Sequence, residues 1–194
     1  MGRGPKKQIN IFLDGKLAIG PGAEGAAQET PPVQTLKPTD SFQHCYNAAT
    51  RYLSYRPRSE SELRERLRQR GSDDNSIRAV IAKLKEQRLL DDATFAKFWK
   101  DNRETFSPRS RWLTTLELRR KGVANEIIVQ TVQTMDDKDC AYRAALNKAR
   151  TLSGTDYEPF VQKLGGYLKR RGFSYSVINQ TVEQLWQDRA AGTI

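Results

Sequence analysis

The chain has 194 residues, of which 37% are hydrophobic and 29% charged, and its formal net charge is +10. This composition is typical of one compact domain or several small modules, and the positive excess favours polyanions or acidic protein surfaces as partners. No run of about 18 apolar residues is present and no apolar stretch follows the basic N-terminus, so neither a membrane span nor a signal peptide is predicted. We expect a cytoplasmic protein that does not bind membranes.

The N-terminal part of the chain is predicted to form a small hairpin and a linker. Apolar runs flank Asp14-Gly15, a pair that readily forms a type I′ turn, so residues 1–20 are assigned to a β-hairpin extension. Residues 21–41 are rich in glycine, proline and small side chains, which is typical of a flexible linker. A GxGxxG match at residues 20–25 is interpreted as part of this linker, because no helix and no second parallel strand follow it.

Beyond the linker, apolar residues recur at three- and four-residue spacings, which predicts an all-α body. A basic helix end followed by glycine occurs three times, at Gly71, Gly122 and Gly172, with intervals of 51 and 50 residues. Each glycine is predicted to take the left-handed conformation that ends a helix. This period favours a tandem array of three-helix modules, elongated and curved. The predicted modules span residues 42–90, 91–135 and 136–190.

Several polar residues are predicted to begin helices. Ser59 and Glu62 form a capping box, and Ser107 is placed as an N-cap with Pro108 after it. Three acidic pairs fall at predicted helix starts, where carboxylates cap free N–H groups, so we interpret them as structural rather than catalytic or metal-binding. These pairs are Asp73-Asp74, Asp91-Asp92 and Asp136-Asp137.

Metal and disulfide chemistry is not expected. Cys45 and Cys140 are the only cysteines and His44 is the only histidine, too few for a disulfide framework or a zinc site. His44 and Cys45 cannot act as base and nucleophile through adjacency, because consecutive side chains on a helix diverge by about 100°. We therefore expect no enzyme activity, no cofactor and no metal.

The second helix of each predicted module is basic at matching positions. One row of basic residues stands three positions before the glycines, and another stands one position before them. Repetition in register predicts a cationic surface for phosphates or acidic loops, whereas a single basic residue is equally consistent with a solvated helix face. The first row is Arg68, Arg119 and Lys169, and the second is Arg70, Lys121 and Arg171. The candidate partner-binding residues are Arg64, Arg68, Arg70, Arg109, Arg111, Arg119, Arg120, Lys121, Lys169, Arg170 and Arg171.

Three sequence blocks resemble the signature blocks of the RecX family of recombinase regulators. The similarity spans about residues 42–188 and includes the phrase LLDD-xx-FA at residues 89–96, together with the basic helix ends in register. The resemblance implies three tandem three-helix modules, no catalytic activity, and binding along the groove of a RecA–DNA filament, where the protein restrains recombinase activity in recombination, DNA repair and the SOS response. The blocks are residues 52–71, 80–103 and 107–123.

Two other functions stay open at this point. Three-helix units with basic second helices can be used like helix-turn-helix modules, which favours direct binding to single- or double-stranded DNA as the alternative. An enzyme is disfavoured, because no residue set supplies a nucleophile, a base and a group that orients the base. A monomer is expected because the repeats can cover one another's apolar faces, although an exposed face on the third module could pair with a second copy.

Overall fold

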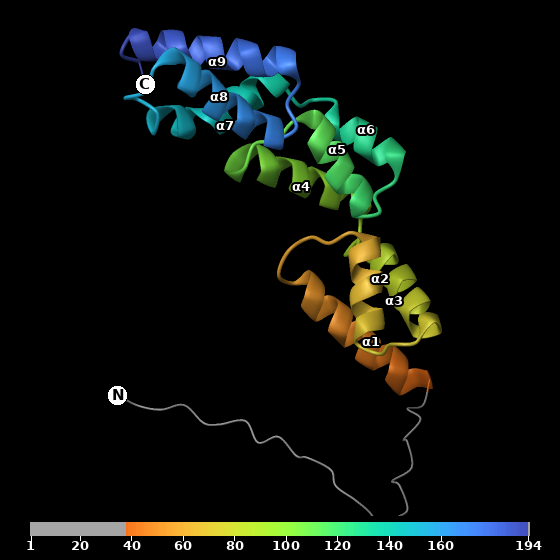
Figure 1. Ribbon diagram of the computed structural model, residues 1–194. Coiled ribbons are helices and arrows are strands. Elements are labelled where there is room, and N and C mark those ends of the chain that lie inside the picture. Colours follow the sequence, from red (N-terminus) through yellow and green to blue (C-terminus); the bar gives the residue numbers. More distant parts are fainter. Residues whose placement is uncertain (1–37, 194) are drawn as a thin grey trace, which may run out of the picture. The chain divides into compact units, whose positions relative to one another are not determined.

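The computed structural model describes residues 38–193, and these residues belong to one unit. Nine α-helices make up the described part, and its main body is helical as the residue spacings predicted (Figure 1). The helices are α1 (Pro38–Leu53), α2 (Glu60–Gln69), α3 (Asp74–Glu86), α4 (Asp92–Phe106), α5 (Arg111–Arg120), α6 (Asn125–Val132), α7 (Asp137–Arg150), α8 (Tyr157–Arg170) and α9 (Tyr175–Ala190).

The predicted fold class needs one correction, because it combined the helical repeats with a β-hairpin. No strand occurs in residues 38–193, and the segment assigned to the hairpin, residues 1–20, lies outside the described residues. The Asp14-Gly15 pair signals a turn, but a turn alone does not make its flanks pair, since an isolated two-stranded hairpin is marginally stable in water. The structure supports an all-α fold of helical repeats, and α1 already begins at Pro38, inside the segment interpreted as linker.

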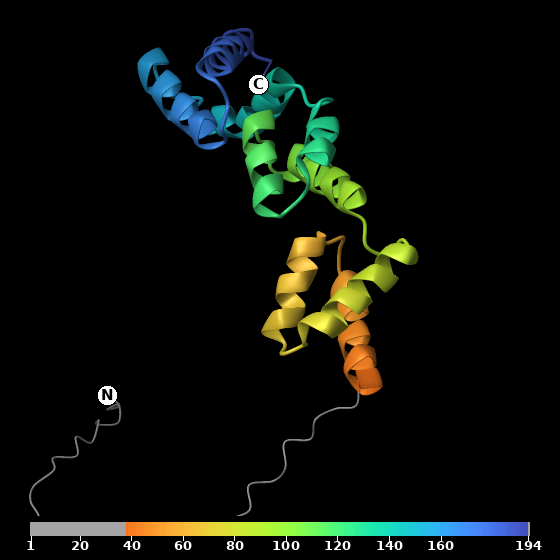
Figure 2. The same ribbon diagram turned by 90° about the vertical axis from the view of Figure 1, so that its right-hand side faces the viewer.

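The main helix–helix packing falls within three consecutive groups, α1–α3, α4–α6 and α7–α9 (Figures 1 and 2). Buried apolar side chains of the described chain form two clusters: the first group has its own, and the second and third groups share one. Leu67, Leu118 and Leu168, which stand four positions before the three glycines, are all fully buried. Leucine recurs at this position because the same position of each second helix faces the hydrophobic core.

The glycines end the second helices as predicted. Gly71, Gly122 and Gly172 have φ values of +80°, +74° and +84°, in the left-handed region that disfavours a Cβ atom. In each case the N–H of the residue after the glycine donates to the carbonyl of the buried leucine, at 3.1 to 3.4 Å. These bonds satisfy carbonyl groups that the last helical turn leaves without a partner.

The acidic pairs begin helices, which confirms the predicted capping role. Asp73, Asp91 and Asp136 are the N-caps of α3, α4 and α7, and their carboxylates accept hydrogen bonds from backbone N–H groups. Hydrogen bonds from the Thr94 hydroxyl and the Thr94 backbone N–H lower the pKa of Asp91. The charged form of this side chain therefore stabilises the start of α4.

The serine caps follow the prediction only in part. Ser59 caps α2 by accepting the Glu62 N–H at 3.1 Å, as expected. The Glu62 carboxylate binds Arg56 instead of completing a capping box. The placement of Ser107 as an N-cap was wrong: it ends α4, and Ser110 caps α5. Pro108 misled the prediction because proline is equally suited to the connection before a helix.

Neither a bilayer-crossing helix nor a metal-binding cluster is found in residues 38–193: none of the helices there is both long and apolar enough to span a membrane, and no three His, Cys, Asp or Glu side chains gather as ligands. The two cysteines are both buried, Cys45 in the cluster of α1–α3 and Cys140 in the shared cluster. Burial raises the pKa of both thiols, that of Cys140 to about 11. Neither thiol should react while its cluster is folded.

We expect thiol labelling to report the opening of each cluster separately. The first cluster holds 9 buried apolar residues and the second 20 among the described residues, so the first gains less from burial. In a urea series, Cys45 in a Cys140→Ala variant should be labelled at lower urea than Cys140 in a Cys45→Ala variant. Labelling of both at the same urea concentration would contradict this and indicate one cooperative unit.

Candidate partner-binding surface

The second helices of neighbouring groups meet end to end. Where α5 ends against the start of α2, the Ser59 hydroxyl donates to the Lys121 carbonyl at 2.7 Å, and Lys121 Nζ donates to Glu62 Oε1 at 2.6 Å. A Cβ atom on Gly122 would lie 2.5 Å from the Cβ of Ser61. This glycine is thus required twice, for its positive φ and for the close approach of the two helix ends.

The end of α8 meets the start of α5 in the same way. The Ser110 N–H donates to the Arg171 carbonyl at 3.1 Å, and the Arg171 guanidinium donates to Ser107 Oγ and the Pro108 carbonyl, both at 3.1 Å. A Cβ atom on Gly172 would come within 2.6 Å of Ser110 Oγ. The repeat therefore extends to the contacts between groups as well as to the groups themselves.

These junctions divide the basic row that stands immediately before the glycines. The side chains of Lys121 and Arg171 bind residues of the neighbouring helix group. Arg70 at the matching position is exposed, and in residues 38–193 no hydrogen bond or ion pair of its side chain is found. Nothing in the described chain lies within 4 Å of a Cβ atom on Gly71, so the end of α2 has no neighbouring helix end there. All three positions carry a basic residue. Whether that residue binds within the protein or stays free at the surface depends on whether another helix end lies beside it.

A buried carboxylate on α5 was not anticipated. Glu117 accepts hydrogen bonds from Trp99 Nε1 at 2.8 Å and from Arg103 Nε at 2.7 Å, and it pairs with Arg109. Its side chain is 10% exposed. Arg109, predicted to contact a partner, is therefore neutralised internally. The one signal in the sequence is that Glu117 is the sole acidic residue on an otherwise basic helix.

Arg64 and Arg111 also contact neighbouring parts of the protein. Arg64 pairs with Glu60 at 2.7 Å, one helical turn away. The Arg111 N–H donates to Asp137 Oδ1 at 2.7 Å, and its guanidinium donates to the Met135 carbonyl. Arg111 therefore ties the start of α5 to the start of α7.

The other predicted residues keep their side chains at the surface. Arg68 pairs with Asp74 at 3.0 Å and Arg119 donates to Asn125 at 3.0 Å, and such exposed pairings are weak enough for a partner to replace. The exposed members without a hydrogen bond or ion pair in residues 38–193 are Arg70, Arg120, Lys169 and Arg170.

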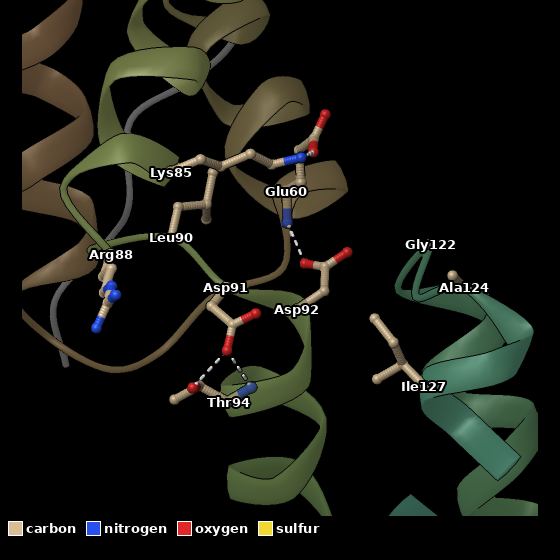
Figure 3. A pocket seen from close by; sticks show the side chains of 10 residues that line it. All are labelled: Glu60, Lys85, Arg88, Leu90, Asp91, Asp92, Thr94, Gly122, Ala124 and Ile127. Carbon is tan, nitrogen blue, oxygen red and sulfur yellow. Dashed lines mark hydrogen bonds and ion pairs between the residues drawn. The ribbon is translucent and has the colours of Figure 1, made fainter. Parts of the chain in front are cut away.

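A surface hollow of about 820 Å³ lies beside the first junction (Figure 3). On one wall, the Asp92 carboxylate accepts the Glu60 N–H at 2.8 Å, and burial raises the pKa of Asp92. Asp91 points to Thr94, the residue whose N–H it caps, while Ile127 lies on the opposite wall. Asp92 of the LLDD phrase thus joins the first and second groups, and both carboxylates of the acidic pair already have partners.

Another cluster of basic residues, on the first helix group, could not be predicted from the spacing of residues in the sequence. Arg51 of α1, Arg58 of the connection after it, Arg66 of α2 and Arg70, the C-cap of α2, line one hollow together with Tyr52. The guanidinium groups of Arg58 and Arg66 lie over the Tyr52 ring. The four arginines come from three different elements, so no sequence period links them. The packing of α1 against α2 brings them together.

These features define a helical-repeat protein whose groups join end to end and which presents cationic second helices. A model of the RecX first three-helix domain matches residues 45–84, and one of the RecX third three-helix domain matches residues 136–182. The chain belongs to the RecX family of regulatory proteins.

Individual relatives agree with this assignment. A "Regulatory protein RecX" of Prosthecochloris aestuarii is 34% identical over 139 residues, covering 72% of this chain and 91% of the relative. Another of Chlorobium limicola is 32% identical over 148 residues, covering 74% and 93%. A crystal structure of RecX from Lactobacillus salivarius superimposes with a TM-score of 0.64 at 26% identity, covering 77% of this chain and 99% of that one.

Proposed function

We propose that this protein is a non-enzymatic cytoplasmic regulator that binds the groove of a RecA–DNA filament and mainly inhibits the recombinase. Membership of the RecX family is the observation that carries the proposal. The exposed cationic residues on α2, α5 and α8 are consistent with it, because a filament of protein and nucleic acid offers acidic loops and phosphates. The protein would act as a monomer by occupying the groove, without a cofactor.

Within this proposal, we assign filament contact to the basic row three positions before the glycines. Arg68, Arg119 and Lys169 are all exposed, and none of them takes part in a junction between groups. Lys121 and Arg171 are better described as residues that hold the groups together. Arg120 and Arg170 neighbour the assigned row and extend the same charge.

Charge reversal of Arg68, Arg119 and Lys169 together is expected to weaken filament binding by about ten-fold or more, since each exposed contact contributes roughly 0.2–1 kcal/mol and reversal adds repulsion. Binding is measured by co-sedimentation with RecA filaments on single-stranded DNA at about 150 mM salt, where the screening length is about 8 Å. Reversal of Arg78, Lys97 and Lys163, which are exposed on other helix positions, is the matched control. Equal loss in both variants would contradict the assignment.

The same experiment separates the alternative function. Stronger retention by filaments than by the naked strand at the same salt concentration supports a regulator of the recombinase. Equal retention on naked DNA would instead favour a direct DNA-binding protein that acts independently of RecA. The cluster of arginines and tyrosines on the first group supports this second candidate, because cationic and aromatic side chains together can bind nucleic acid.

A further inference from the structure

The first helix group carries a cationic hollow. Its volume is about 360 Å³. It is formed by the end of α1, the connection after α1, the exposed face of α2 and the C-cap of α2. The lining residues are Ala48, Arg51, Tyr52, Tyr55, Arg58, Arg66 and Arg70, with no carboxylate among them.

The four arginines lack counter-charges. Six other arginines of the described chain form ion pairs with carboxylates, but in residues 38–193 no carboxylate lies within ion-pair distance of these four. Arg58 Nε is moreover buried without a hydrogen-bond acceptor there. A buried donor without a partner is unfavourable, and like charges gathered around one hollow repel each other. An anion that enters the hollow reduces this repulsion.

At the matching positions of the second group, the protein itself supplies the anion that neutralises the arginine. Counted back from the glycines, Arg58 matches Arg109 and Arg66 matches Glu117. In the second group the Glu117 carboxylate neutralises Arg109. In the first group the same position carries Arg66, so the carboxylate is replaced by another cation. The site is therefore built for an anion from outside the described chain.

The aromatic residues of the hollow point to the class of anion. The Arg58 guanidinium lies 4.2 Å from the centre of the Tyr52 ring and that of Arg66 lies 5.9 Å from it, so Tyr52 holds the two cations in place. Tyr55 is 72% exposed, and no stacking partner for its ring is found in residues 38–193. An exposed aromatic ring beside cations is the arrangement that binds single strands, whose bases can stack on it.

We propose that Arg51, Arg58, Arg66 and Arg70 bind the phosphates of a single-stranded nucleic acid, and that an unpaired base stacks on Tyr55. The guanidinium groups suit phosphate oxygens, to which they can donate two parallel hydrogen bonds. A duplex keeps its bases stacked within the helix and offers Tyr55 no free face. Binding of a single strand at this site requires no recombinase, so it can be tested separately from the proposed regulatory function.

The test uses the full chain and a fluorescein-labelled oligothymidine, with affinity measured by fluorescence anisotropy over a series of salt concentrations. Tyr55→Ala should weaken binding by about five-fold or more, as expected for loss of one stacked base, and leave the salt dependence unchanged. Tyr55→Phe should bind like the unmodified protein. Tyr175→Ala is the control, because Tyr175 is 79% exposed on α9, far along the chain.

A second variant, Arg66→Glu, places in the first group the carboxylate that the second group has. It should pair internally with Arg58, keep the protein folded, and lower the slope of log affinity against log salt by about 1.4, corresponding to two phosphates of a single strand. Arg78→Glu makes the same charge change on α3, outside the hollow. It should reduce the slope by less than half of that amount.

Four outcomes would overturn the site. They are unchanged affinity in Tyr55→Ala, equal effects of Arg66→Glu and Arg78→Glu, equal binding of a duplex of the same length, and displacement of the strand by poly-glutamate of matched charge at the same concentration. The last outcome would indicate a surface for acidic protein segments. Because no recombinase is present, none of these results depends on whether the protein regulates RecA.

Discussion

Gly172→Ala is expected to lower the free energy of unfolding by about 2–5 kcal/mol. An alanine in the left-handed region costs about 1–2 kcal/mol, and overpacking a tight contact adds about 1–3 kcal/mol. The contact is tight because the new Cβ would lie 2.6 Å from Ser110 Oγ and 2.8 Å from the Leu113 Cβ. The measurement is urea unfolding followed by circular dichroism.

Gly71→Ala is the matched control for this prediction. Gly71 has nearly the same φ, +80° against +84°, but nothing in the described chain lies within 4 Å of its Cβ position. Its substitution should therefore cost only the conformational part, about 1–2 kcal/mol. Equal losses in the two variants would show that the contact between α8 and α5 contributes nothing, and would contradict the end-to-end junction.

Glu117→Ala is expected to destabilise the protein by about 2–4 kcal/mol. Removing one partner of a buried ion pair typically costs about 3–5 kcal/mol, and we lower this because Arg103 and Arg109 are 20% and 31% exposed and keep some water. Trp99 also loses the acceptor of its indole N–H. The change should appear both in urea unfolding and in the tryptophan fluorescence of the folded protein.

A double-mutant cycle tests whether this loss comes from the cluster itself. Glu117→Ala and Arg103→Ala should couple by about 0.5–3 kcal/mol, because the two side chains are in direct contact. Pairing Glu117→Ala with Arg78→Ala, an exposed change on α3, should be additive within about 0.5 kcal/mol. Coupling of the same size in both cycles would argue for a global effect instead of a local ion pair.

The local features of this protein could be predicted from its sequence. Gly71, Gly122 and Gly172 end helices, and acidic residues such as Asp73 and Asp91 begin them, because φ and capping bonds depend on residues a few positions apart. The helical class followed from the three- and four-residue spacing of apolar side chains, whose burial needs no knowledge of distant neighbours. The fold class was wrong in adding a β-hairpin: no strand occurs in residues 38–193, the hairpin segment lies outside them, and a turn signal alone does not determine strand pairing.

The use of each basic residue was decided by the tertiary structure. Lys121 and Arg70 occupy the same position in the repeat, yet Lys121 meets Glu62 across 59 positions of the chain, whereas Arg70 meets no helix end. Periodicity identifies positions that are alike, but an ion pair requires a carboxylate within about 4 Å, and that neighbour comes from another element. For the same reason Glu117 and the arginines around Tyr52 became visible only when the helices were packed.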